Sequence, residues 1–290
     1  MTTKKNCCAL ALSELSPCQE IFPTRDSNGR HFDFEDSFGP SSVAAVVAKV
    51  ALGGYTIFTW IYMLVESNYR GFFFSYLTVW VLSLQVIYHI FSLWNSLSPP
   101  PGINGRIKFT WWLYNMVVHV DIVVVLLWWL TLYDPDTTEM KFTEIAPHSS
   151  TCVVALLDGL LVNRIPIRLH HWYISVLPLN IAYPVWTIVH SLLDIGNPNN
   201  KDDDPETNDD VIYDTVDWKD DWQGTLVFII IMMLVVGPIL QLVLYVLSLY
   251  SPCCRISRRY LPDEEQVGND GHNKEDTRNG SDEEMWASAY

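Results

Sequence analysis

Two residues in separate apolar stretches, Thr78 and His148, are of types that can do chemistry together. A threonine hydroxyl is a poor nucleophile at its ordinary pKa and needs an adjacent base, for which histidine is the usual choice. The pair predicts hydrolysis through an acyl-threonine, with His190 as a second candidate base. The alternative is structural, because a membrane threonine commonly hydrogen-bonds its own backbone and a histidine at a helix start often caps it.

The elements that must position this pair are six apolar stretches. A helix crosses the hydrocarbon core of a membrane with about 20 mostly apolar residues. The stretches that predict such helices are residues 43–65, 71–94, 111–133, 148–162, 172–193 and 225–250. Their apolar residues cover all faces, which argues against the core helices of a soluble domain. The sequence therefore predicts an all-α fold, a six-span transmembrane helix bundle with disordered cytosolic tails.

Lysine and arginine are distributed unevenly between the predicted loops. They predominate in the N-terminal arm, in the second and fourth loops and after the last span, all on one side of a six-span chain. Basic loops stay in the cytosol, so we expect both termini there. The predicted parts are a cytosolic arm (1–42), the membrane domain (43–250) with an acidic lumenal loop (194–224), and an acidic cytosolic tail (251–290). An endomembrane and the plasma membrane both stay open.

Polar residues inside the predicted spans form stripes along single helical faces. Such residues are costly in lipid and usually face the interior of a bundle. The stripes are Ser75, Thr78, Gln85 and His89 in the second span, His148, Thr151 and Asp158 in the fourth, and Asn180, Tyr183, Thr187 and His190 in the fifth. Three polar stripes predict a shared polar cavity.

The predicted depth of each residue in the membrane indicates which of these polar side chains could meet. A hydroxyl and two imidazoles, those of Thr78, His148 and His190, are expected to meet in the lumenal half of the bundle. Asp158 lies ten residues beyond His148, which is about 15 Å along a helix and too far for direct contact. No third group that would orient the histidine follows from the sequence. The predicted supporting residues are His190, Thr187, Asp158 and Tyr183.

Two cysteines, Cys253 and Cys254, directly follow the last predicted span and are beside Arg255, Arg258 and Arg259. Cysteines next to a span and a basic cluster are typical of palmitoylation at an anionic leaflet. Ordinary reduced thiols are an equal alternative for this pair.

Composition and motifs exclude several other classes of site. The formal net charge is -15, concentrated in the fifth loop and the C-terminal tail. The acidic loop lacks the glycine turn and the terminal glutamate of an EF-hand, and the sequence has no cysteine or histidine pair with zinc spacing. It also has no glycine-rich phosphate loop and no basic stripe for nucleic acid. We therefore expect no metal, no cofactor and no nucleic-acid partner, and membrane lipids as the surroundings. The sequence indicates no protein partner.

Several short motifs occur in an order that resembles a known family. They are Tyr76-Leu77-Thr78-Val79-Trp80, the predicted helix start at His148 followed by Asp158, Pro166-x-Arg168-x-x-His171, Tyr183, and Ile212-Tyr213 through Asp217-Trp218. In their order and spacing the chain resembles the rolling stone proteins from about residue 55 to residue 250, without the tails. Members of that family are associated with myoblast fusion.

The rolling stone layout is similar to that of the androgen-induced multi-pass proteins, which hydrolyse fatty-acid esters of hydroxy fatty acids. In that group a membrane threonine and a histidine carry the reaction, and the matching positions here are Thr78 and His148. The resemblance implies an intramembrane hydrolase that needs no cofactor and takes an apolar lipid ester from the bilayer. Two alternatives stay open, which are a non-catalytic membrane organiser in cell fusion or adhesion and a small-solute transporter that uses the polar stripes.

Overall fold

The computed structural model describes residues 42–67, 70–100, 103–135, 140–163, 165–197, 211–213 and 215–250. Across these residues the structure is helical and contains no strand. Six helical segments are long and apolar enough to cross a membrane. The predicted all-α bundle with six spans is therefore confirmed.

Each span is one helix or a series of helical segments joined without a break. The first three spans comprise α3 (Val43–Glu66), α4 (Leu77–Leu97), and α5 (Gly105–Leu127) with the π-helical turn Trp128–Leu132. The fourth comprises α6 (Phe142–Ile145), the π-helical turn Ala146–Ser150, α7 (Thr151–Leu157) and the π-helical turn Asp158–Val162. The last two comprise the π-helical turn Trp172–Val176 with α8 (Leu177–Leu192), and α9 (Trp222–Ile231), the π-helical turn Met232–Val236 and α10 (Gly237–Tyr250).

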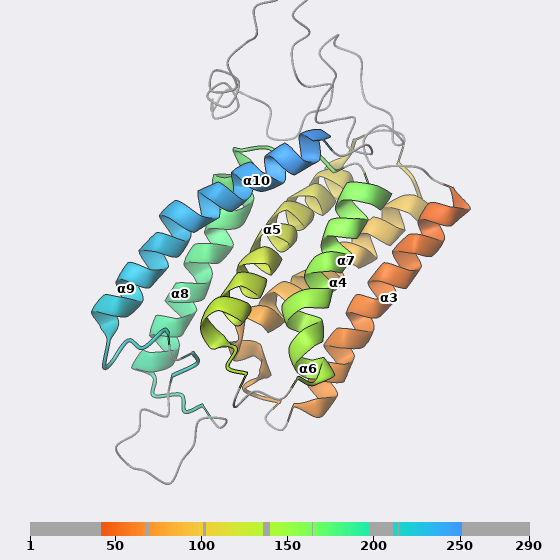
Figure 1. Ribbon diagram of the computed structural model, residues 1–290. Coiled ribbons are helices and arrows are strands. Elements are labelled where there is room, and N and C mark those ends of the chain that lie inside the picture. Colours follow the sequence, from red (N-terminus) through yellow and green to blue (C-terminus); the bar gives the residue numbers. More distant parts are fainter. Residues whose placement is uncertain are drawn as a thin grey trace, which may run out of the picture.

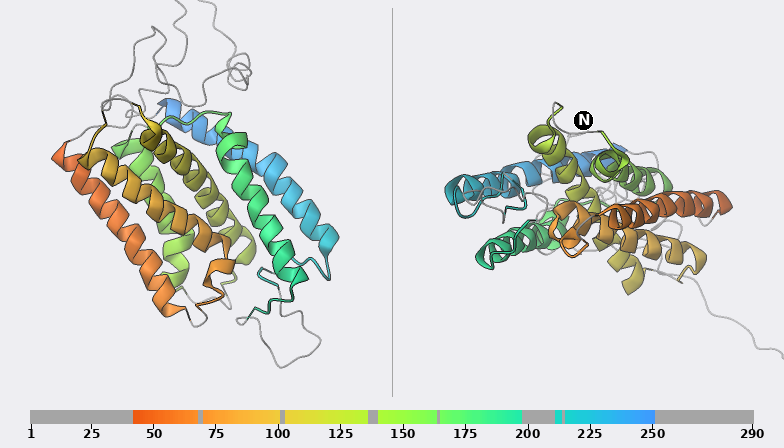
Figure 2. Two further views of the ribbon diagram at one scale, coloured as in Figure 1. Left: turned by 180° about the vertical axis from the view of Figure 1, so that it is seen from behind. Right: turned by 90° about the horizontal axis from the view of Figure 1, so that it is seen from below.

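The third span, α5, lies at the centre of the bundle (Figure 1). It packs against α4, α7 and α10, and its Trp111 and Tyr114 side chains are fully buried. α3 packs on α4 and forms one edge of the molecule, while α9 forms the opposite edge in both further views (Figure 2). Polar groups on α4, α5 and the fourth span are thereby brought into the interior.

Side chains are sorted between interior and exterior as a lipid environment requires. Large apolar residues such as Phe58, Ile61 and Leu234 are exposed on the outer faces of the spans. Polar residues such as Gln85 and Asn115 are buried between helices. An exterior rich in large apolar side chains, with polar groups buried between the helices, marks a surface that contacts lipid, since hydrocarbon cannot hydrogen-bond the polar groups.

The second and fourth helices begin at different residues from those that the sequence predicts. The chain makes a turn and a 3₁₀ segment (Phe73–Ser75) before α4 begins at Leu77, so Thr78 lies in the first turn of this helix. The fourth helix begins at Phe142 rather than at residue 148, so His148 lies inside the helix and not at its start. Hydropathy marks the apolar part of a span, whereas backbone hydrogen bonds continue through polar residues such as Glu144.

The position of Gly159 in the fourth span gives a test of this packing. A Cβ atom at Gly159 would overlap the Tyr114 ring of α5, whereas Gly54 on α3 has no such neighbour within 4 Å. We expect Gly159→Ala to lower the free energy of unfolding in detergent by about 1–3 kcal/mol. The matched Gly54→Ala should be neutral or stabilise by up to about 1 kcal/mol, because alanine favours a helix over glycine. Equal thermal unfolding midpoints for the two variants would contradict the packing of α5 against the fourth span.

Candidate active site

Thr78 and His148 contact each other directly in the folded chain. The Thr78 Oγ1 and His148 Nε2 atoms are 3.2 Å apart. Thr78 is buried in the first turn of α4 and His148 is half-buried in the π-helical turn of the fourth span. Pro147 has no N–H to donate to an α-helical ladder, and the backbone adopts this π-helical turn around it. The two residues that the sequence selects are thus brought together, while their catalytic role stays a prediction.

The backbone sets the protonation of the His148 ring. Its Nδ1 atom lies 2.7 Å from the carbonyl oxygen of Glu144. A carbonyl oxygen only accepts hydrogen bonds, so Nδ1 carries the proton of the neutral ring and Nε2 is left as an acceptor. The Thr78 hydroxyl therefore donates to Nε2. This arrangement has the three parts of a nucleophile, a base and an orienting group, with the carbonyl in the place of a carboxylate.

Trp128 fixes the plane of the His148 ring. The two rings are stacked with their centroids 3.9 Å apart and an angle of 7° between their planes. Trp128 begins the π-helical turn at the end of α5, so it reaches His148 from a different span. A ring held by stacking and by a backbone hydrogen bond keeps Nε2 directed at Thr78, which limits the motion that weakens a base.

Tyr213, from the segment before the last span, completes the surroundings of Thr78. The Leu77 N–H donates to the Tyr213 hydroxyl oxygen over 3.2 Å. Burial raises the pKa of Tyr213 to about 12, against the lowering effect of its hydrogen bonds with Tyr183, Thr78 and Leu77. The phenol therefore stays protonated at physiological pH and is available as a donor. Tyr213 belongs to the Ile212-Tyr213 motif, but the sequence alone indicates no role for it.

The Thr78–His148 pair lies in the wall of an apolar cavity. This cavity has a volume of about 100 Å³, is partly open to the outside, and is lined mostly by apolar side chains of α4, α5, α8 and α9. Polar groups in its wall include Thr131, Asn180, Tyr183 and Thr187. A concave wall that is mostly apolar and has few polar groups is typical of sites for apolar ligands, and the opening lets part of such a ligand stay outside this small cavity.

The predicted supporting residues are divided between this cavity and other places. Tyr183 lines the cavity and donates to the Ser75 carbonyl over 3.0 Å. Thr187 also lines it, donates to the Pro184 carbonyl and accepts from the Trp218 indole N–H. His190 does not line the cavity and packs against the Phe72 and Trp186 rings, so the expected meeting of two imidazoles at Thr78 does not occur. His190 therefore faces aromatic side chains, although it belongs to the same polar stripe of the fifth span as Tyr183 and Thr187.

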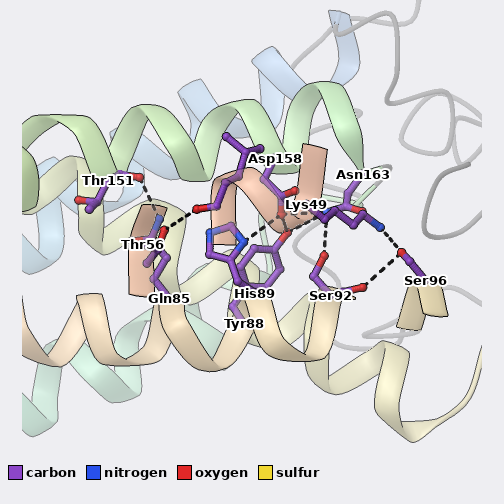
Figure 3. Close-up of polar contacts among 11 residues, drawn as sticks. Lys49, Thr56, Gln85, Tyr88, His89, Ser92, Ser96, Thr151, Asp158 and Asn163 are labelled. Carbon is purple, nitrogen blue, oxygen red and sulfur yellow. Dashed lines mark hydrogen bonds and ion pairs between the residues drawn. The ribbon is translucent and has the colours of Figure 1, made fainter. Parts of the chain in front are cut away.

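Asp158 belongs to a second, fully buried polar cluster between α3, α4 and the fourth span (Figure 3). Its Oδ2 atom accepts from Tyr88 over 2.5 Å and from Asn163 over 2.9 Å, and lies 3.7 Å from the His89 ring. Lys49 donates to Ser96 over 2.5 Å and interacts electrostatically with Asp158. As expected, the hydrogen bonds of Asp158 are with residues other than His148, and this cluster joins three spans instead.

The remaining predicted sites concern metals and cysteines. Among the residues that the structure describes, no group of three or more His, Cys, Asp or Glu residues could hold a metal ion. The palmitoylation candidates Cys253 and Cys254 lie outside the described residues. Cys152 in the fourth span is a buried free thiol.

Six apolar spans with a polar interior define a multi-pass membrane protein. No family profile matches the chain, and no solved structure does. The chain is similar to Protein rolling stone of Drosophila melanogaster, with 25% identity over 183 residues, or 57% of this chain. The match spans 63% of the length of that relative. This distant similarity supports the predicted resemblance to rolling stone proteins, while the relation to the androgen-induced hydrolases stays a prediction.

The buried cluster around Asp158 gives a second test. We expect Asp158→Ala to lower the free energy of unfolding by about 3–5 kcal/mol, because it removes the buried acceptor of Tyr88 and Asn163 and the negative charge near Lys49. Asp158→Asn keeps an oxygen for the Tyr88 and Asn163 donors and should cost clearly less. Chemical unfolding of the detergent-solubilised protein measures both. Small and equal losses would show that the cluster contributes little to joining the spans.

Proposed function

We propose that this protein is an intramembrane hydrolase of lipid (fatty-acid) esters, with Thr78 as the nucleophile and His148 as the base. The observation that carries the proposal is the Thr78 hydroxyl, 3.2 Å from His148 Nε2, in the wall of an apolar cavity. Nδ1 of the same ring is held by a backbone carbonyl, so the ring nitrogen that faces the hydroxyl is the basic one. The similarity to rolling stone adds support at the level of the membrane fold.

The proposed reaction has two steps. Thr78 Oγ1 attacks the ester carbonyl carbon while His148 Nε2 takes the hydroxyl proton. The ester C–O bond then breaks, the leaving alkoxide takes this proton from His148, and an acyl-threonine remains. A water molecule, deprotonated by His148, adds to the acyl-threonine and releases the fatty acid and the free Thr78 hydroxyl. The reaction consumes one water and needs no cofactor.

Tyr213 has the position and the protonation for stabilising the oxyanion of each step. Its phenol accepts from the N–H of Leu77, the residue before Thr78, and lines the same two cavities as Thr78, so its oxygen lies near the atom that attacks the ester. A donor directed at the developing negative charge usually contributes more than any other single group to such a reaction. Tyr183 acts as a positioning residue, since it lies near Tyr213 and is itself fixed by donating to the Ser75 carbonyl, which leaves the Tyr213 proton free for the oxyanion.

The substrate is proposed to reach the cavity from the surrounding lipid. Cavity residues come from spans whose outer faces are apolar, so an acyl chain stays in apolar surroundings along its path. The basic loops place both termini in the cytosol in this proposal, and the Thr78 end of α4 on the lumenal or outer side. A glycan on Asn279, in the sequon Asn279-Gly280-Ser281 of the tail, would contradict this orientation.

Covalent labelling tests the nucleophile and its base. The purified protein in detergent is treated with a fluorescent fluorophosphonate, which reacts with activated hydroxyls. We expect Thr78→Ala and His148→Ala to reduce the labelling rate by at least about a hundredfold. The matched control is Thr131→Ala, since Thr131 lines the same cavity but donates to the Leu127 carbonyl. Labelling that persists in Thr78→Ala, or its absence in folded wild type, would overturn the proposal in favour of a non-catalytic organiser or a transporter.

Changing Tyr213 to Phe tests the proposed oxyanion donor. We expect a roughly hundredfold lower rate of ester hydrolysis with a folded protein. With a pKa of about 12, the phenol keeps its proton well below that pH. The pH–rate profiles of wild type and variant should therefore have the same shape from about pH 6 to pH 10 and differ only in height. A change of shape in this range would mean that Tyr213 acts by losing its proton instead.

A further inference from the structure

A second cavity lies on the other side of the Thr78–His148 pair. It has a volume of about 420 Å³ and is partly open to the outside. We call it the polar chamber, and the cavity described above the apolar chamber. Both chambers are lined by the same four residues, which are Thr78, Trp128, His148 and Tyr213. The candidate nucleophile and base thus stand in a wall between two spaces of different chemistry.

The two chambers differ in charge. No ionised side chain lines the apolar chamber apart from the titratable His148, whereas Glu66 at the end of α3 and Glu144 in α6 line the polar chamber. No lysine or arginine lines the polar chamber. Lys141 is near Glu144 but is exposed and does not line it. The polar chamber therefore presents two carboxyl groups and no basic side chain in its wall, with Lys141 acting on Glu144 from outside the wall.

Aromatic side chains form much of the remaining wall of the polar chamber. They are Phe73, Tyr76, Trp128 and Tyr213. Aromatic rings together with carboxylates attract an organic cation, and quaternary ammonium groups are commonly bound in such surroundings. A carboxylate or phosphate without a compensating cation would instead meet two glutamates at this place.

We propose that the polar chamber binds an ammonium group, so that the substrates are esters of a fatty acid with an ammonium-bearing alcohol. This inference rests on the proposed hydrolysis. The acyl chain extends from the surrounding lipid into the apolar chamber, the ester carbonyl faces Thr78 in the shared wall, and the cationic alcohol lies toward Glu66 and Glu144. Hydrolysis consumes water and yields a fatty acid on one side of the wall and the cationic alcohol on the other. Esters that carry a free carboxylate on the alcohol side are disfavoured.

Three matched esters test this charge selectivity. Palmitoylcholine and 3,3-dimethylbutyl palmitate have the same shape and differ in one positive charge, and 3-(palmitoyloxy)propanoate carries a negative charge. We expect wild type to hydrolyse the choline ester with a kcat/KM about tenfold or more above that of the neutral isostere. The anionic ester should have the lowest value. Equal values for the cationic and neutral esters, or a preference for the anionic one, would overturn the inference and leave the hydrolase proposal standing.

Removing the charges of Glu66 and Glu144 tests whether these two carboxylates cause the charge selectivity. Glu66→Gln and Glu144→Gln should each reduce the ratio of choline to dimethylbutyl turnover by about threefold or more, and the double variant should bring it close to one. Asp134→Asn is the matched control, because Asp134 is exposed near the same end of the bundle and lines neither chamber. A ratio that survives in the double variant would locate the cation elsewhere.

Binding separates this inference from the proposed catalysis. The Thr78→Ala variant cannot form the acyl-threonine, so ligand binding is measured on it from tryptophan fluorescence without turnover. Palmitoylcholine should bind about tenfold more tightly than 3,3-dimethylbutyl palmitate. If wild type hydrolyses none of the esters but this binding preference is present, the hydrolase proposal fails and the ammonium site stands. If the preference is absent as well, both fail.

Discussion

Hydrocarbon offers no hydrogen-bond partners, and this constraint orders the polar side chains of every described span. Buried polar side chains occur along several spans, and two groups of them are central to the site and to the packing. One group joins Thr78, His148 and Tyr213, and the other surrounds Asp158. The first borders two cavities, whereas every side chain named in the second is buried. The same constraint thus produces one polar site that borders cavities and one buried polar cluster around Asp158, which we call the joint because it connects three spans.

The accessible site depends on backbone geometry as much as on side chains. Glu144 contributes its carbonyl to the His148 ring and its carboxylate to the polar chamber, because a π-helical turn follows it directly. Trp128 also starts a π-helical turn, on the neighbouring span. Such turns are frequent at functional sites, where they change the direction of side chains without ending a helix. Here two of them face each other across the stacked rings.

Sequence reasoning reached the number of spans and the Thr78–His148 contact because both follow from hydropathy and helical periodicity. It missed the start of the fourth helix, since Thr143 and Glu144 lower hydropathy without interrupting backbone hydrogen bonds. It could not find the Glu144 carbonyl as an orienting group, because every residue has a carbonyl. The sequence also predicted that His190 meets Thr78. A polar stripe shows which face of a helix is polar but not which part of the fold this face contacts, and His190 packs against Phe72 instead. The role of Tyr213 could not be predicted either, because this residue lies in the loop before the last span and periodicity does not show where a loop passes.

The joint around Asp158 also bears on the order in which the chain is inserted. Lys49 lies in the first span, whereas Asp158 lies at the end of the fourth. During synthesis the ammonium group enters the membrane long before its carboxylate exists. Ser96 on the second span is the earlier partner, so the first two helices can hold the lysine as a hairpin. The lysine thus has a polar partner before the fourth span is made, and it gains its charged neighbour only when that span joins the bundle.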